Sequence, residues 1–207
     1  MPDHTVQLPT PGAVLDYWIG AASEDHLFAH RQHKLWFTKS ADTDVFIVRH
    51  FAALHAALHA GLAQSWARAG ARSRLGAIIV LDQFSRNMFR DTPEAFASDQ
   101  LAMELARQGM AAGDHMQLTE IERSFFYLPF EHSEALEDQD ESVSLFGRLA
   151  ADARDVFRPI CTSSLDYALR HRDVIQRFGR FPHRNAILGR DNTAEEADYL
   201  SKPGAGF

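Results

Sequence analysis

Helix start and stop signals recur along the whole chain, and the alternation of apolar and polar residues that marks strands is scarce. Thr119 with Glu122, and Thr193 with Glu196, match the capping box, in which the two side chains bond each other's backbone N–H groups at a helix start. Gly113 follows a segment of helical apolar spacing, where a glycine commonly ends a helix. The pattern predicts an all-α chain, built as a compact multi-helix array of antiparallel helix pairs.

The same signals set the expected helices. These cover 11–19, 43–60, 74–90, 98–113, 119–128, 138–153, 163–178 and a last helix from 193, with irregular or broken helix over 21–41 and a short piece after 182. We expect Ser73 to cap the 74–90 helix, Gly61 to end the 43–60 helix, and Pro129 to kink or restart the chain. The 207 residues contain no linker, so we expect a single helical domain over 1–207 with flexible ends at 1–10 and 203–207.

Bulk composition narrows the class of protein. Hydrophobic residues make up 45% of the chain and charged residues 24%, as in a globular domain. The formal net charge of −7 argues against nucleic-acid binding, and the longest apolar run, 77–81, is far shorter than the roughly 20 residues that span a bilayer. Cys161 is the single cysteine, and the first residues show no leader pattern. We therefore expect a soluble, cytoplasmic protein without nucleic-acid or membrane partners, and its oligomeric state stays open.

Charge is unevenly distributed along the chain. Six acids lie between Glu131 and Glu141, whereas six arginines lie between Arg170 and Arg190. The two segments are either separate solvated faces or partners in which guanidinium groups meet carboxylates. Both segments also carry histidines, so they are candidates for a site as well as for a scaffold.

The 74–90 segment is apolar almost all round, which predicts a buried helix. Asp82, Arg86 and Arg90 are spaced four apart and form one charged stripe on this apolar cylinder. The stripe is either a structural ion pair that joins helices, or the wall of a pocket in which Arg86 or Arg90 binds an anion.

Two further polar segments follow breaks between helices, where side chains and free N–H groups point into shared space. In the first, His132 is flanked by Glu131 and Glu134. The second polar segment surrounds His183. Between them, His171 lies on an apolar helix face, where a hydrogen-bonded core histidine is the commoner case and a ligand the alternative. We expect three segments to converge in space: 82–90, 129–134 and 171–185.

The chain lacks the common metal-binding spacings: there is no His-Glu-x-x-His, no Cys pair, no EF-hand loop and no Glu-x-x-His. It also lacks Gly-x-Ser-x-Gly, the P-loop and the dinucleotide fingerprint. We therefore expect no metal and no cofactor, and the common nucleophile and nucleotide chemistries have no support.

Four segments carry longer motifs: Val14–Gly20, Leu81–Asn87, Leu128–Glu134 and Arg177–Asn185. They resemble, in order, the signature segments of a bacterial family called domain of unknown function 924, and the resemblance extends from about Val14 to Gly204. It implies an all-helical fold of the tetratricopeptide-repeat-like superfamily and implies no activity. Ser85 stands where the family usually has Pro, and Ile19 where Phe is usual. Ser85 is expected to let its helix run straighter.

Three functions are open. The favoured one is a binding module whose polar pocket takes a small anion or a peptide carboxylate. One alternative is a hydrolase-type enzyme in which His132 or His171 acts as general acid or base. The other is a purely structural polar network, with a protein-interaction surface elsewhere. The residues that we expect to line the ligand site are Asp82, Arg86, Asn87, Arg90, Glu131, His132, Glu134, His171, Arg180, His183, Arg184 and Asn185.

Overall fold

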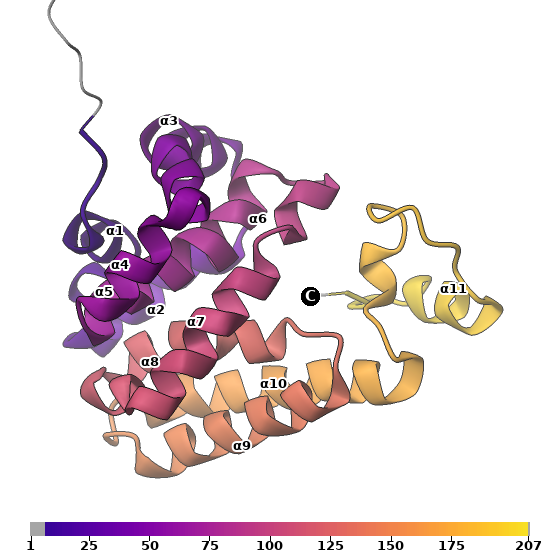
Figure 1. The fold of residues 1–207 in the computed structure, drawn as a ribbon. Coiled ribbons are helices and arrows are strands. Elements are labelled where there is room, and N and C mark those ends of the chain that lie inside the picture. Colours follow the sequence, from indigo (N-terminus) through magenta and orange to yellow (C-terminus); the bar gives the residue numbers. More distant parts are fainter. Residues whose placement is uncertain (1–6, 207) are drawn as a thin grey trace, which may run out of the picture.

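The computed structural model describes residues 7–206, and no strand occurs within that range. The all-α class predicted from the sequence is therefore confirmed. The helices and helical turns, arranged as in Figure 1, are α1 (Pro11–Trp18), η1 (Gly20–Ser23), α2 (His26–Phe37), α3 (Ala41–Ala57), η2 (Leu58–Leu62), α4 (Ala63–Arg68), α5 (Ala71–Ile79), η3 (Val80–Phe84), α6 (Ser85–Met88), η4 (Pro93–Phe96), α7 (Asp99–Ala112), η5 (Asp114–Gln117), α8 (Glu120–Glu131), α9 (Leu136–Asp152), α10 (Arg158–Phe178), η6 (Pro182–Arg184) and α11 (Ala194–Leu200).

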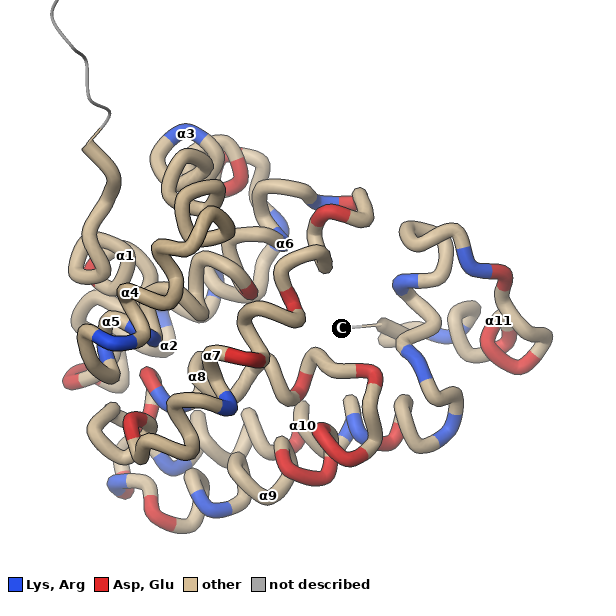
Figure 2. Tube along the Cα trace, in the orientation of Figure 1, with Lys and Arg blue, Asp and Glu red and all other residues tan. Residues whose placement is uncertain are grey.

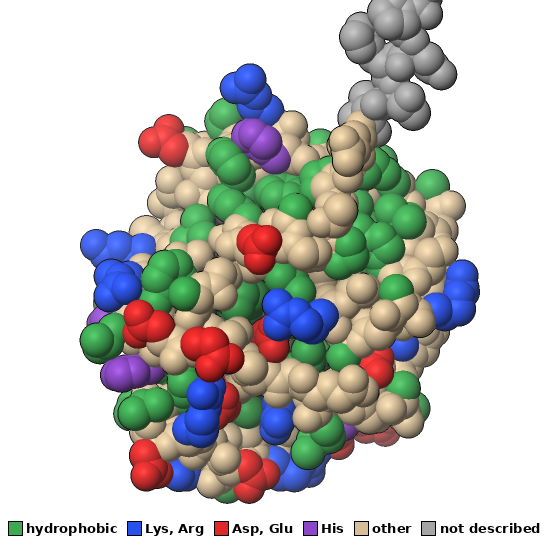
Figure 3. Space-filling view, turned by 90° about the vertical axis from the view of Figure 1, so that its left-hand side faces the viewer, with side chains coloured by type: hydrophobic (Ala, Val, Ile, Leu, Met, Phe, Trp, Pro, Cys, Tyr) green, Lys and Arg blue, Asp and Glu red, His purple; other side chains and the backbone are tan. Residues whose placement is uncertain are grey.

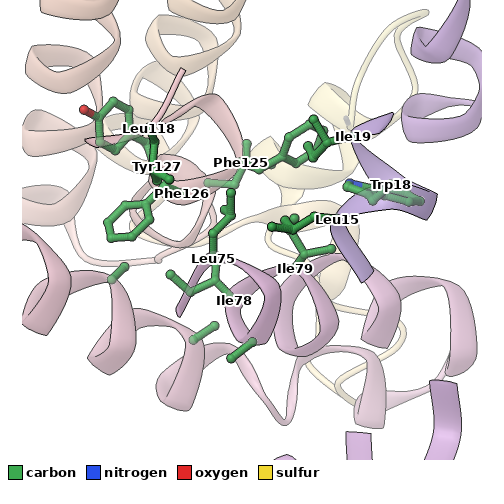
Figure 4. Close-up of a cluster of buried hydrophobic side chains, with 14 of the residues drawn as sticks. Leu15, Trp18, Ile19, Leu75, Ile78, Ile79, Leu118, Phe125, Phe126 and Tyr127 are labelled. Carbon is green, nitrogen blue, oxygen red and sulfur yellow. The ribbon is translucent and has the colours of Figure 1, made fainter. Parts of the chain in front are cut away.

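The main apolar core forms where α1, α5 and α8 meet, as Figure 4 shows. Trp18 at the end of α1 is fully buried and packs edge-on against Phe125 of α8, with ring centroids 6.0 Å apart. The helices α9 and α10 lie side by side against α8 along one edge of the molecule (Figure 1). A second, smaller apolar cluster holds the C-terminal segment together and consists of Val174, Ile175, Phe178, Phe181 and Tyr199.

The predicted 74–90 helix is buried, as its apolar surface indicates, but its limits and shape differ from the prediction. It begins at Ala71 after Gly70, whose φ of +121° suits glycine, so Ser73 is not its N-cap. It widens into a π-helical turn at η3. The expectation that Ser85 lets the helix run straighter stays a prediction. The Ser85 hydroxyl donates to the carbonyl of Leu81 at 2.7 Å, a side-chain bond that commonly bends helices.

The segment 21–41, expected to be irregular or broken, contains the continuous helix α2. The Asp25 carboxylate caps it by accepting from the N–H groups of Leu27 (2.8 Å) and Phe28 (3.1 Å). Ala29 is the one residue of α2 that is fully buried. Because the helix rests mainly on partly buried side chains, its apolar periodicity is weak, and the sequence pattern missed it.

Gly61, with φ of +114°, is non-helical and separates two helical stretches at a kink, so the helix end predicted there is confirmed, and the next stretch continues as α4. Two more boundaries depart from the prediction. The helix α10 begins at Arg158, before Ser163 and Ser164, because Pro159 occupies the first turn, where a missing N–H costs nothing. The helix α8 runs through Pro129 and ends two residues later.

One helical stretch, Ala41–Arg68, is long and apolar enough to cross a membrane by length and composition, with a hydropathy of 1.4 in its most apolar window. It bends at Gly61, and one face packs in the core through fully buried residues such as Ile47 and Leu54. Its opposite face exposes Val45 and Val48. Figure 3 shows hydrophobic and charged side chains together on the face of the molecule that lies on the left in Figure 1. Scattered apolar side chains are normal on protein surfaces. The absence of a membrane partner stays a prediction.

Candidate functional site

The π-helical turn η3 places a charged residue, Asp82, deep in the apolar interior with 1% of its surface exposed. Its Oδ1 lies 2.7 Å from Nδ1 of His132, the C-cap residue of α8, while Gln83 donates to Oδ2 at 2.6 Å. The Arg86 guanidinium lies 3.3 Å from Oδ1 and donates to the Asp82 carbonyl at 2.6 Å. Asp82 therefore joins α6 to α8 and has partners on both carboxylate oxygens.

These contacts determine the protonation of the pair. Burial by itself raises the pKa of Asp82. The positive charge of Arg86 and the contact with His132 lower it by more than burial raises it, so the pKa of Asp82 lies well below its usual range. Burial, together with Arg86, lowers the pKa of His132. At neutral pH the carboxylate is ionised and can only accept, so His132 must carry its proton on Nδ1. Its Nε2 is left as a hydrogen-bond acceptor and base.

Arg86 links this pair to the first residue of α7. Its NH1 and NH2 atoms donate to the two carboxylate oxygens of Asp99 at 2.9 and 3.1 Å. This bidentate geometry is the strong form of an Arg–carboxylate contact. Arg86 is therefore held between Asp82 and Asp99, and is committed to neutralising both.

Glu131 and His171 form a second buried acid–base pair. His171 Nδ1 lies 3.3 Å from Glu131 Oε1 and 2.8 Å from the Tyr167 carbonyl. Burial and the nearby Asp82 charge raise the pKa of Glu131 to about 8, whereas burial lowers the pKa of His171 to about 3. Both groups are therefore neutral near pH 7. His171 is sealed in the interior on a backbone carbonyl, which removes it from the general-base candidates.

The C-terminal segment returns to the end of α8 through Glu134. The Arg190 guanidinium donates to both Glu134 oxygens, at 2.7 and 2.9 Å, and the N–H of Phe181 donates to Oε1 at 2.8 Å. Fully buried Asn185 accepts from Arg190 Nε at 2.9 Å and donates to Asn192. Figure 2 shows acidic positions near the start of α9 opposite basic positions on this segment. The acidic and basic runs of the sequence thus meet here, and also at Arg172 and Asp140.

Arg184 is the most unusual cation of the site. It is 7% exposed, and its guanidinium carbon lies 4.7 Å from the ring centroid of Phe96 and 4.5 Å from that of Phe181. Its nearest carboxylate, on Asp99, is 3.8 Å away, beyond hydrogen-bond distance, and its buried Nε has no hydrogen-bond partner among residues 7–206. Burial lowers the pKa of Arg184 to about 10, so it remains charged at neutral pH.

An open cleft of about 400 Å³ connects these groups to solvent. His132, Glu134, Asp99 and Arg184 supply its charged and titratable walls. The remaining lining residues are Phe96, Gln100, Met103, Pro129, Ser133 and Leu188. The described end of the chain also approaches this region: a Cβ added at Gly206 would lie 3.2 Å from Cβ of His183, and Figure 1 shows the C-terminal segment turning back from α11. Burial and Arg184 lower the pKa of His183 to about 4.

Of the predicted site residues, His132, Glu134 and Arg184 line the cleft. Three others, Arg90, Asn87 and Arg180, bind carboxylates that lie outside it. Arg90 and Asn87 both bind Asp44 of α3, Arg90 through bonds of 2.7 and 2.8 Å and Asn87 through one of 2.8 Å. The expected stripe breaks up because the π turn and the end of α6 at Met88 redirect the chain before Arg90. Arg180 binds Glu196 and so joins the cap of α11.

Sequence reasoning missed residues in and beside the cleft. Asp99, which lines the cleft, was expected as a helix start, and Arg190, which binds the lining residue Glu134, was expected as a member of the arginine-rich segment, but neither was placed in the site. Phe96 carried no signal at all. Within residues 7–206, no group of three or more His, Cys, Asp or Glu side chains is arranged to hold a metal ion.

Residues 14–204 match the family described as "Bacterial protein of unknown function (DUF924)", and the chain belongs to that family. A protein of unknown function from Agrobacterium tumefaciens is similar in structure, with a TM-score of 0.74 and 35% sequence identity over 92% of this chain and 96% of its own. No curated protein matches the sequence.

Proposed function

We propose that this protein binds a small anionic ligand, a carboxylate or a phosphate ester with an apolar body, in the cleft beside Arg184. The observation that carries the proposal is the buried Arg184 guanidinium, whose Nε has no hydrogen-bond partner within residues 7–206. A buried donor without a partner costs free energy, and more so when it is charged. Arg184 lines the cleft, so an anion bound there would give its guanidinium group a charged hydrogen-bond partner.

The other charges of the cleft support an anion rather than a cation. Asp99 is held by both arms of Arg86, and Glu134 is held by both arms of Arg190. Each of these acids is already neutralised, whereas Arg184 has no carboxylate within hydrogen-bond distance. The apolar lining side chains, including Met103, offer a surface for the body of the ligand.

Replacing Arg184 by Met tests the proposal. We expect inorganic phosphate and phenyl phosphate to raise the melting temperature of the wild-type protein at constant ionic strength, with phenyl phosphate the stronger ligand. Arg184→Met should abolish both shifts, since it keeps the apolar stem and removes the donors. Arg177→Met is the matched control, because Arg177 lies exposed in the last turn of α10 and pairs with Glu195.

Two outcomes would count against anion binding. One is a wild-type protein that no phosphate or carboxylate stabilises. The other is an Arg184→Met protein that is stabilised as much as the Arg177→Met control. Either result would favour the structural reading of the polar network.

A second candidate function, general-base catalysis of a hydrolytic reaction, is supported by the pair of Asp82 and His132. The 2.7 Å bond from His132 Nδ1 to a buried carboxylate holds the imidazole in one tautomer, and His132 lines the cleft. An orienting carboxylate of this kind improves a histidine base. Arg184, at the same cleft, would stabilise negative charge that develops on the substrate.

Asp82→Asn tests this second candidate with 4-nitrophenyl acetate and 4-nitrophenyl phosphate as probes. If the wild type hydrolyses either probe, Asp82→Asn and His132→Gln should each lower the rate by about 10²–10⁴-fold. His50→Gln, on an exposed face of α3, should leave the rate unchanged. Hydrolysis that persists in His132→Gln, or a wild type that cleaves neither probe, would remove His132 as a base. Far-UV circular dichroism of each variant would separate lost chemistry from lost folding.

A further inference from the structure

Two histidine side chains outside the cleft point at one serine hydroxyl. His59 Nε2 lies 2.8 Å and His55 Nε2 lies 3.0 Å from Oγ of Ser98. Ser85 Oγ is 3.0 Å from His55 Nε2 and 3.3 Å from Ser98 Oγ. The histidines are spaced four apart at the junction of α3 and η2, and their ring centroids are 4.9 Å apart.

The hydrogen positions in this cluster can be assigned by counting protons. Ser85 donates its only hydroxyl proton to the Leu81 carbonyl. The contact between Ser85 and His55 therefore requires a proton on His55 Nε2, which also faces Ser98. Ser98 is then left to donate to His59 Nε2. The four side chains form one neutral network whose nitrogens converge on Ser98.

We propose that His55, His59 and Ser98 form a binding site for one divalent transition-metal ion of the zinc class. Imidazole nitrogen is a preferred ligand of Zn²⁺, Ni²⁺ and Cu²⁺, and two histidines one helical turn apart present their nitrogens on the same side. Ligand distances of about 2.05 Å at tetrahedral angles require ligand atoms about 3.3 Å apart. The two separations between Ser98 Oγ and the histidine nitrogens, 2.8 and 3.0 Å, are each within a few tenths of an ångström of that value.

The surroundings of the cluster suit a metal ion. His59 is exposed, which lets it move and lets water complete the coordination. Binding would shift the His55 proton from Nε2 to Nδ1 and turn the Ser98 hydroxyl toward Ser85, so no side chain has to ionise.

Such an ion would stiffen one wall of the cleft. Ser98 immediately precedes Asp99, and both follow the short turn that carries Phe96. The metal ion would link the segment that contains Phe96, Ser98 and Asp99 to α3. In the absence of the ion, hydrogen bonds link this segment to α3. The site is separate from the proposed anion site, because none of its three ligands lines the cleft.

Titration of untagged, chelator-treated protein with Zn²⁺ tests this proposal. We expect one equivalent to bind and to raise the melting temperature, and His59→Ala to weaken this binding at least about tenfold. His59→Cys should restore it, because a thiolate also binds zinc. His30→Ala is the matched control: His26 and His30 are likewise spaced four apart on a helix, but within residues 7–206 neither ring bonds a hydroxyl group.

Co²⁺ gives a second readout, since its visible absorption reports tetrahedral coordination. Ser98→Ala should keep two nitrogen ligands and alter that spectrum. Zinc binding that is equal in the wild type and His59→Ala, or that is lost in His30→Ala instead, would overturn the proposal and leave the cluster as a hydrogen-bond network. Phosphate binding in Arg184→Met addresses the cleft alone, so the two proposals can fail separately.

Discussion

Replacing Gly109 by alanine is expected to lower the free energy of unfolding by about 2–4 kcal/mol. Gly109 lies in α7 at a point where a Cβ would be 2.5 Å from Cδ of Arg74 and 2.5 Å from Cζ of Phe126. Phe126 is fully buried in the core, so its ring has no free space to move into.

The Arg74 side chain cannot move away from an added Cβ either, because its guanidinium group donates hydrogen bonds to three partners. Nε donates to Asp114 at 2.7 Å, NH2 to the Ala67 carbonyl at 3.0 Å and NH1 to the Leu105 carbonyl at 3.3 Å. A shift of the side chain would leave a buried ion pair incomplete, which is the costly way to lose one. Urea unfolding, followed by tryptophan fluorescence, measures the effect.

Gly147→Ala is the matched control. Gly147 lies inside α9, and nothing comes within 4 Å of an added Cβ. Alanine should therefore stabilise the protein by up to about 1 kcal/mol through its higher helix propensity. Equal effects of the two substitutions would show that α7 and α5 are not packed as tightly as the structure has them.

Glu131→Gln is expected to raise stability at pH 7 by about 3 kcal/mol. The pKa of Glu131 is raised from 4.5 to about 8 by burial and by Asp82, so the folded protein keeps a proton that the unfolded chain has lost above pH 4.5. Unfolding therefore releases a proton between about pH 4.5 and pH 8. The contribution of Glu131 to stability is present below pH 4.5 and is lost as the pH rises toward 8. Glutamine is neutral throughout and carries no such loss.

The difference in unfolding free energy between the variant and the wild type is the quantity to measure. It should be close to zero below pH 4.5 and grow by about 1.4 kcal/mol for each pH unit up to about pH 8. Taking the difference removes the contribution of His183, whose lowered pKa affects both proteins in the same way.

Glu134→Gln supplies a control of opposite sign from the same turn. Burial raises the pKa of Glu134, but the Arg190 pair and the Phe181 N–H lower it more, so its net shift is downward. Its contribution to stability is present above its unfolded pKa and is lost as the pH falls, so glutamine should destabilise the protein at pH 7. A Glu131→Gln protein that is less stable than the wild type at pH 7 would mean that Glu131 is ionised.

Helix boundaries that depend on nearby residues could be read from the sequence. The capping boxes at Thr119 and Thr193 are both present, and Gly113 and Gly179 follow the last residues of α7 and α10 in left-handed conformations. These signals work because a cap or a positive φ involves only a few neighbouring residues. The helix α2 was missed because its packing on Trp18 and on the core is long-range.

The convergence of the 82–90, 129–134 and 171–185 segments was foreseen, because charged side chains within apolar stretches must find partners. The identity of those partners was not. Asp99 lines the cleft and pairs with Arg86, and Arg190 pairs with the lining residue Glu134, while Arg90, Asn87 and Arg180 bind carboxylates outside the cleft.

Local propensity and apolar spacing thus determined that this chain is helical and that its buried charges gather. Which carboxylate each guanidinium group contacts depends on how the helices are turned relative to one another, and the spacing of residues in the sequence does not determine that. The π turn at Val80–Phe84 is one such feature, and the return of the C-terminal segment onto α8 is another. Both are set by contacts between residues far apart in the chain. They leave Arg184 buried without a hydrogen-bonded acid among the described residues, and the proposed function rests on that arrangement.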